Sequence, residues 1–140
     1  MIDPRQYISQ NIKSDLVIEI LRGFELDIRY DIDLLHENTP DKYWIEAFKY
    51  GFCFKANQDK IIDCAFIHLI KNEKYDKYPW DLAEIEIVNG EIPSLGSPTK
   101  SGVYQDVCWV RYDSAFRSIH VTINKGGPYL LTIMDANIVP

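Results

Sequence analysis

Apolar residues recur at helical spacing over the first twenty residues of the chain. Asp3 followed by Pro4 is typical of a helix start, because the acid caps free backbone N–H groups and proline has none. Ser14 offers a second cap before another apolar stripe, and Gly23 is a natural stop. The pattern predicts one interrupted helix, or two short ones, over residues 4–22, with its apolar stripe packed on the core.

The next segment alternates between apolar and charged residues. From Phe24 to Leu34 apolar side chains stand at even positions and charged ones between them. A period of two favours a half-buried strand, and an acidic loop lying on a sheet fits the same composition. The polar stretch 36–41 that follows is predicted to be a turn.

From Tyr43 onward the pattern becomes that of β-strands. Two apolar runs, 51–57 and 61–70, flank a polar tip and predict a hairpin. The unbroken second run predicts a central strand covered on both faces. Three further strands are expected at 107–113, 117–124 and 129–135.

The middle of the chain is less regular. Residues 71–81 have the composition of a polar, aromatic loop, and 84–88 alternates like a short edge strand. Gly, Pro and Ser crowd 89–102, which predicts irregular structure. Together the patterns predict an α+β fold, with an N-terminal helix or helices packed on a mainly antiparallel meander sheet, in a single domain over 1–140.

Composition narrows the classes of function. Fifteen basic and twenty-one acidic residues give a net charge of −6, which argues against nucleic-acid binding and suits either solubility or a basic partner. Cys53, Cys64 and Cys108 each sit in an apolar run, which predicts free, buried cysteines in a reducing compartment. Without a signal pattern or an apolar run of 18 residues, we expect a cytoplasmic protein that does not enter a membrane.

Candidate chemistry is sparse. His68 and His120 lie in predicted strands and could face each other, so a small enzyme or ligand-binding domain using both is one alternative. A hydrogen-bonded sheet histidine is the more common role. We find no nucleophile motif and no metal-ligand spacing, and therefore predict no catalytic residue, metal or cofactor, and no enzyme.

An acidic, aromatic stretch is the strongest candidate for partner binding. Exposed Trp and Tyr anchor protein interfaces, and carboxylates around them attract basic partners. The same aromatic side chains could equally be buried in the core. The candidate partner-binding residues, with two acids from the alternating segment added, are Tyr75, Asp76, Tyr78, Trp80, Asp81, Glu84, Glu86, Asp31 and Asp33.

The order of segments in residues 43–135 resembles a known group of small bacterial proteins. The shared features are LGSPTKSG, WVRYD, SIHVTIN and YLLTIM, that is, a loose GxPxxSG…WxxYD…SIHV…TIM ending. These motifs place turn and sheet residues, among them Gly96, Gly102, Trp109 and His120. The chain departs from the group at Gly90 and Pro93, where a short amphipathic helix is expected and Pro93 disfavours one.

Members of that group are often immunity proteins of polymorphic or contact-dependent toxin systems. The resemblance implies a protein that binds a cognate toxin, for example a nuclease, and blocks its active site or an adjacent surface. It carries over no catalytic residue. A structural or assembly component remains a further alternative, and the sequence leaves the oligomeric state open.

Overall fold

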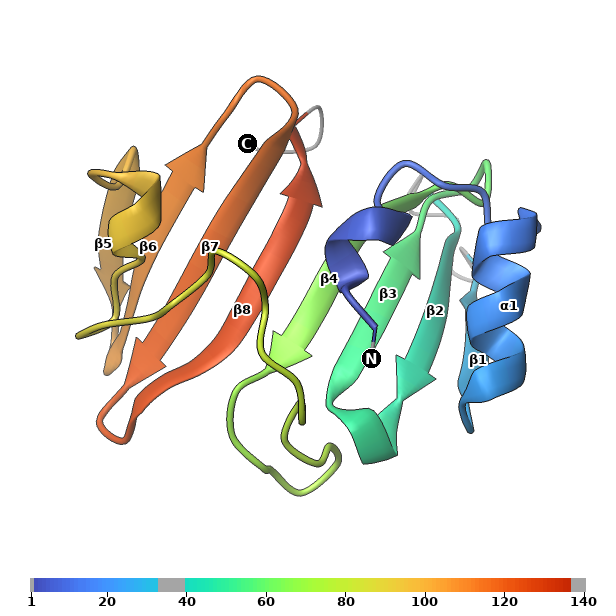
Figure 1. The fold of residues 1–140 in the computed structure, drawn as a ribbon, viewed down its shortest axis with the longest axis horizontal. Helices are drawn as coiled ribbons and strands as arrows, with labels where there is room; N and C mark the ends of the chain where they lie inside the picture. Colours follow the sequence, from blue (N-terminus) through green and yellow to red (C-terminus); the bar gives the residue numbers. More distant parts are fainter. Residues whose placement is uncertain (1, 33–39, 137–140) are drawn as a thin grey trace.

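The computed structural model describes residues 2–32 and 40–136, and these form an eight-stranded antiparallel sheet with the order β1-β2-β3-β4-β8-β7-β6-β5 (Figure 1). The sheet consists of two four-stranded meanders whose last strands, β4 and β8, pair with each other. The strands are β1 Asp27–Asp31, β2 Lys42–Ala47, β3 Phe52–Ala56, β4 Ile62–His68, β5 Lys100–Tyr104, β6 Val107–Asp113, β7 Arg117–Asn124 and β8 Gly127–Asp135.

The helical part is smaller than the sequence predicts. The first predicted helix is a single 3-10 turn, η1 (Pro4–Tyr7), capped by the Asp3 side chain, which accepts a hydrogen bond from the Arg5 backbone N at 3.0 Å. The second is α1 (Asp15–Gly23), capped by Ser14 and ending at the expected glycine. Between them Asn11 forms an antiparallel bridge with Ile61 at the start of the hairpin's second arm, so this stretch cannot be helical.

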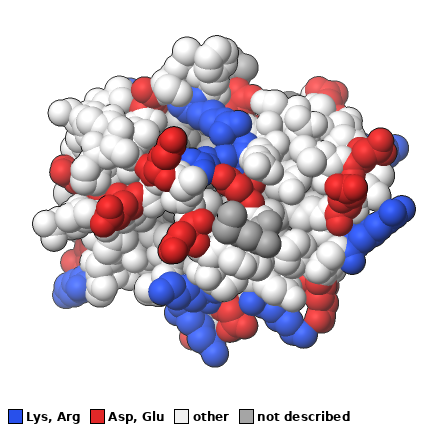
Figure 2. Space-filling model, in the orientation of Figure 1, with Lys and Arg blue, Asp and Glu red and all other residues white. Residues whose placement is uncertain are grey.

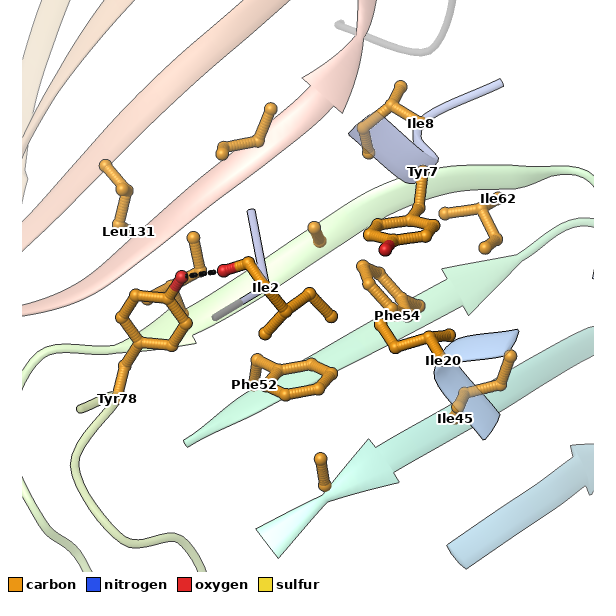
Figure 3. Packing of buried hydrophobic residues seen from close by; sticks show 14 of the residues in the cluster. Ile2, Tyr7, Ile8, Ile20, Ile45, Phe52, Phe54, Ile62, Tyr78 and Leu131 are labelled. Atoms are coloured by element: carbon orange, nitrogen blue, oxygen red, sulfur yellow. Dashed lines mark hydrogen bonds between the residues drawn. The ribbon is translucent and has the colours of Figure 1, made fainter. Parts of the chain in front are cut away.

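One face of the sheet, which we call the covered face, carries the hydrophobic core. In Figure 1 η1, α1 and the later part of the long connection between β4 and β5 lie in front of this face. Phe52 and Phe54 of β3 are fully buried there, and the rings of Tyr7 and Phe54 are 5.5 Å apart (Figure 3). The Tyr78 hydroxyl donates to the Ile2 carbonyl and joins the connection to the N-terminal segment.

The other face, which we call the open face, carries the alternate side chains of each strand. Pairing registers place Glu46, Cys53, Phe66 and His120 in one row across it. The prediction that β4 is covered on both faces is therefore correct only in part. Helices and connection cover one face, whereas on the other Trp44 and Phe66 stack at 6.0 Å beside the buried thiols.

Three predictions for irregular regions have different outcomes. The alternating segment contains a strand, β1, at the edge of the sheet. The predicted strand over 84–88 is wrong: Glu84 has a positive φ of 66°, and only an isolated bridge joins Val88 to Glu91. In the stretch predicted to be irregular, η3 (Pro93–Leu95) is one 3-10 turn, and β5 follows as a strand that the sequence prediction missed.

The missed strand depends on a contact across the β5–β6 hairpin. A Cβ at Gly102 would lie 2.7 Å from the Trp109 indole, so the ring of the neighbouring strand covers the glycine. Glycine disfavours a strand in isolation, and here cross-strand pairing and the overlying ring supply the stabilisation that local propensity lacks.

Candidate functional site

The connection between β4 and β5 (residues 69–99) crosses the covered face from Tyr78 onward and carries an unbalanced charge there. Residues 78–99 contain no Lys or Arg, and four carboxylates stand exposed along them, namely Asp81, Glu84, Glu86 and Glu91. Figure 2 shows acidic side chains across the centre and left of this face, where Figure 1 places the connection. Four negative charges in this short segment are a large share of the net charge of −6.

A groove runs beneath this connection. Its volume is about 740 Å³, and an adjoining hollow of about 500 Å³ shares Asp81 and adds Glu84 and Glu86. One basic side chain, Lys77, also borders the groove. The walls are otherwise largely apolar and include Leu69, Trp80, Leu82, Ile85, Pro128 and Leu131. We refer to the two hollows together as the acidic groove.

Aromatic packing fixes the position of Trp80 in the groove wall. Its ring stacks on Tyr50 at 5.9 Å with an interplanar angle of 4°, and Phe24 and Tyr78 meet it edge-on at 5.9 and 5.5 Å. Such offset and edge-to-face pairs stabilise a single ring orientation. Trp80 is half-buried and keeps part of its surface at the groove.

Hydrogen bonds shape the acidic rim. The Ile85 backbone N donates to the Leu82 carbonyl at 3.1 Å and closes a turn. Ser94 donates through its hydroxyl to the Glu84 carbonyl at 2.5 Å, which joins the rim to η3. Two hydrogen bonds therefore hold the rim around Glu84.

The structure brings together four of the predicted partner-binding residues and separates the others. Trp80, Asp81, Glu84 and Glu86 line the acidic groove. Tyr78 lies at the same place with its ring buried, so it packs the fold and is not an exposed anchor. Asp33 lies outside the described residues.

Tyr75, Asp76 and Asp31 lie away from the acidic groove. Tyr75 is buried on the open face, where its ring stacks on His68 at 4.0 Å. Asp76 is exposed and pairs with Lys71 at 3.7 Å. Asp31 accepts hydrogen bonds from Arg29 at 3.0 Å and from the Trp44 indole N–H at 2.8 Å.

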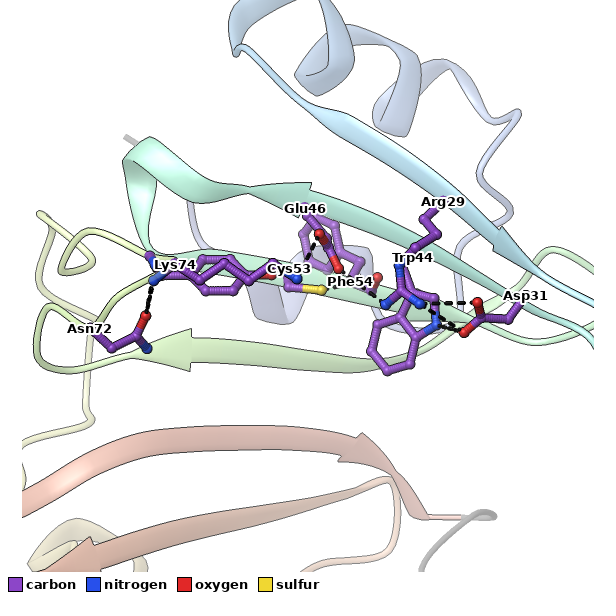
Figure 4. A network of polar contacts seen from close by, with 9 residues as sticks. Arg29, Asp31, Trp44, Glu46, Cys53, Phe54, Asn72 and Lys74 are labelled. Atoms are coloured by element: carbon purple, nitrogen blue, oxygen red, sulfur yellow. Dashed lines mark hydrogen bonds and ion pairs between the residues drawn. The ribbon is translucent and has the colours of Figure 1, made fainter.

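A buried carboxylate forms the centre of the open-face network (Figure 4). The Glu46 side chain is 6% exposed and contacts Arg29 Nη2 at 3.3 Å and Lys74 Nζ at 3.4 Å. Lys74 also lies 5.1 Å from the centre of the Phe48 ring. These cations neutralise the carboxylate, so this network stabilises the fold and presents little net negative charge.

Two of the three cysteines fit the sequence prediction. Cys53 and Cys64 are free and buried, and burial raises the pKa of each thiol to about 12. Both are therefore protonated at neutral pH and poor nucleophiles. Cys108 is exposed on β6, next to the edge strand β5, where none of the described helices covers it. The prediction of burial is wrong there.

The two histidines share the open face but do not meet. His68 pairs with Leu130, Leu130 with Thr122, and His120 lies two residues further along β7. Two strand spacings and two residues of rise separate the pair by roughly 12 Å, too far to bind one metal ion. Among the described residues, no group of three His, Cys, Asp or Glu side chains could hold a metal.

Sequence reasoning missed the apolar wall of the groove. Leu82, Ile85 and Ile87 line it, and Ile85 and Ile87 belong to the alternation that predicts an edge strand over 84–88. Their apolar character was visible in the sequence. That these side chains line a groove follows only from the path of the connection over β4 and β8.

The fold and the groove define a class: an α+β domain with a single antiparallel sheet, one covered face and an acidic groove on that face. Comparison with family models, curated proteins and solved structures gave no match to this chain. Among the residues described, no helix has the length and apolar character needed to cross a bilayer.

Proposed function

We propose that this chain is an immunity protein that binds a cognate bacterial toxin through the acidic groove and so neutralises it. The observation that carries the proposal is the run of four exposed carboxylates, with no Lys or Arg from residue 78 to 99, beside an apolar groove. The resemblance of residues 43–135 to immunity proteins supports the choice of partner.

Charge and shape have separate roles in the proposed binding. Asp81, Glu84 and Glu86 steer a basic surface toward the groove and speed association, above all at low ionic strength. The half-buried Trp80 and its apolar neighbours then supply contact area for a side chain or loop of the toxin. If the toxin is a nuclease, its basic active site matches this acidic rim, and binding there excludes the nucleic acid.

The test is binding to the polypeptide encoded beside this gene. We expect a complex at micromolar concentration or tighter, measured by calorimetry with the full chain. The triple variant D81N/E84Q/E86Q should weaken binding at least tenfold, mainly through slower association, and should flatten its salt dependence. Absence of a complex at micromolar concentration would refute the proposal.

A matched control separates groove charge from total charge. E19Q/D59N/D106N removes the same three charges from exposed positions away from the groove and should leave affinity within about threefold. Equal weakening by both triple variants would mean that only net charge matters. Binding unchanged by either would mean that the acidity serves solubility.

The two alternatives receive less support from the structure. A metal or ligand site shared by His68 and His120 conflicts with their separation across β8. An assembly role requires self-association without a foreign partner.

A further inference from the structure

The open face carries a buried arginine whose hydrogen bonding is incomplete. The side chain of Arg111, on β6, is only 9% exposed, although a guanidinium has five N–H donors to satisfy. Asp113 Oδ1 lies 3.1 Å from Arg111 Nε, close enough for an ion pair but without the geometry of a hydrogen bond. Among the described residues, none accepts a hydrogen bond from this guanidinium.

Asp113 compensates this cation only in part. Its Oδ1 also accepts a hydrogen bond from the Ser118 hydroxyl at 2.6 Å, and its side chain is 30% exposed to water. Both features weaken the attraction between Asp113 and Arg111. Burying a guanidinium with unfilled donors is costly, so Arg111 indicates a further partner, either ordered water or an anion.

A second incompletely bonded group lies beside Arg111. His120 of β7 is its cross-strand neighbour, and His120 Nε2 is buried without a hydrogen-bond partner in the described part of the chain. Burial, then the charge of Arg111, lowers the pKa of His120, so the imidazole is neutral at pH 7 and close to the guanidinium. A neutral imidazole still carries one N–H donor.

The charges at this place do not cancel. Lys100 of β5 is the other cross-strand neighbour of Arg111 and is exposed. With His120 neutral, two cations, Lys100 and Arg111, stand against one carboxylate, Asp113. One positive charge therefore remains on this part of the open face, although the chain as a whole carries −6. A single positive charge is balanced by a monovalent anion.

Apolar side chains continue the same face beside these charges. Trp109 lies two residues before Arg111 on β6, and its ring meets His120 edge-on at 5.2 Å with an interplanar angle of 85°. The pairing register places Thr122 of β7 and then Leu130 of β8 next to Trp109 across the face. Trp109, Thr122 and Leu130 are all partly exposed, so they offer contact area to the body of a ligand.

We propose that this part of the open face binds a small monocarboxylate with an aromatic or other apolar body. The two oxygens of a carboxylate lie in one plane and match the planar fork of guanidinium donors at Arg111. The body of the ligand rests on Trp109 and its neighbours. A phosphate dianion carries more charge than this surface balances, and acetate has no body to bury.

The test is titration of the full chain with benzoate at neutral pH, followed by NMR. We expect saturable binding with a Kd of about 1 mM or lower and the largest shifts at Trp109, Arg111 and His120. Benzamide has the same shape without the charge and should bind at least tenfold more weakly, as should inorganic phosphate. No saturation by about 20 mM benzoate, or equal binding of benzamide, would mean that ordered water is the partner of Arg111.

Substitution of Arg111 separates a ligand site from a structural ion pair. Arg111→Met keeps an apolar stem and should weaken benzoate binding at least tenfold, with the melting temperature unchanged or raised, because an incompletely bonded buried cation is lost. Lys125→Gln removes one positive charge from an exposed turn and is the matched control, which should bind benzoate normally. Benzoate binding retained in Arg111→Met, or equal weakening by both variants, would overturn the proposal.

A measurement on the unmodified protein locates the ligand whether or not the variants fold. A carboxylate bound at Arg111 lies close to His120 and should raise the pKa of that imidazole, because nearby negative charge stabilises its protonated form. His68 is roughly 12 Å away, and its pKa should stay unchanged under saturating benzoate. An equal rise at both histidines, or none at His120, would contradict binding at this place.

This inference is independent of the proposed toxin binding. Arg111 lies on the open face, whereas the acidic groove is on the covered face. Arg111→Met should therefore leave toxin affinity unchanged, and D81N/E84Q/E86Q should leave benzoate affinity within about threefold. Either proposal can fail without the other.

Discussion

The ring of Tyr75 lies flat on the imidazole of His68, with centroids 4.0 Å apart and an interplanar angle of 14°. The same ring meets Phe48 at 5.0 Å, and Asn72 accepts a hydrogen bond from the Tyr75 backbone N at 2.7 Å. Tyrosine often anchors protein interfaces, but Tyr75 instead fixes the start of the connection against the end of β4.

Truncation of Tyr75 should destabilise the fold. Tyr75→Ala removes a ring that is only 8% exposed, and we expect a loss of about 3–4 kcal/mol in the free energy of unfolding, measured by urea denaturation. Tyr104→Ala, at a residue 72% exposed, is the control and should cost less than about 0.5 kcal/mol. Comparable losses in the two variants would contradict the packing role of Tyr75.

The two histidines on the open face should make the free energy of unfolding depend on pH. Burial lowers the pKa of His68 below its ordinary 6.5, and burial, then the charge of Arg111, lowers that of His120. The unfolded chain then binds protons more readily, so the free energy of unfolding should fall as pH drops below about 6.5. The fall should end once the folded-state pKa values are passed.

Urea denaturation at pH 7.5 and 5.5 measures this effect, and NMR titration assigns it to each imidazole. We expect both to titrate below 6.5 in the folded protein. His68→Gln should reduce the difference in stability between the two pH values. Titration of His68 above 6.5, or a larger difference in the variant, would show that the burial argument is incorrect.

Gly51 should tolerate no side chain. Its φ is +66°, and a Cβ there would lie 2.3 Å from the Tyr78 backbone N and 2.4 Å from the Asp76 carbonyl oxygen. Gly51→Ala must displace the connection, so we expect a loss of at least about 3 kcal/mol in the free energy of unfolding.

Gly23→Ala is the matched control for the glycine variant. A Cβ there meets no atom within 4 Å, and alanine favours the helix, so stability should stay unchanged or rise by up to about 1 kcal/mol. Thermal melting of Gly51→Ala and Gly23→Ala measures both changes in stability. A stable Gly51→Ala protein would mean that the connection does not pack on this turn.

Glu46→Gln should cost about 1–2 kcal/mol in the free energy of unfolding. The carboxylate is buried, whereas its partners Arg29 and Lys74 are half or more exposed, so water screens part of each ion pair. Combining it with Arg29→Gln should cost less than the sum of the single losses, because both remove the same pair. Glu25→Gln breaks the exposed pair with Lys49 and should leave the free energy of unfolding nearly unchanged. Full additivity of the Glu46 and Arg29 losses would contradict the network.

The local signals in the sequence predict several elements correctly. Asp3 and Ser14 cap the two helical segments and Gly23 ends α1. Alternation allows either a strand or a loop for the segment in which the structure has β1. The hairpin of β3 and β4 and the three C-terminal strands follow from apolar runs separated by turns. Each of these depends on interactions between residues close in the chain, which composition and spacing record.

Other elements depend on residues that are distant in the chain. Residues 84–88 are not a strand because neither sheet edge pairs with them in the described structure. Sequence spacing also cannot show that Trp80 and Glu86 line one groove while Tyr75 lies on the opposite face.

The sequence by itself therefore determined an acidic α+β domain, the helix caps, most strands and the run of carboxylates from Asp81 to Glu91. Only the tertiary structure decided which face each side chain occupies, where the groove forms and which strands remain as edges. The physical reason is that caps, turns and periodicity are local properties, whereas the pairing of β4 with β8 and the path of the connection depend on contacts between segments far apart in the chain.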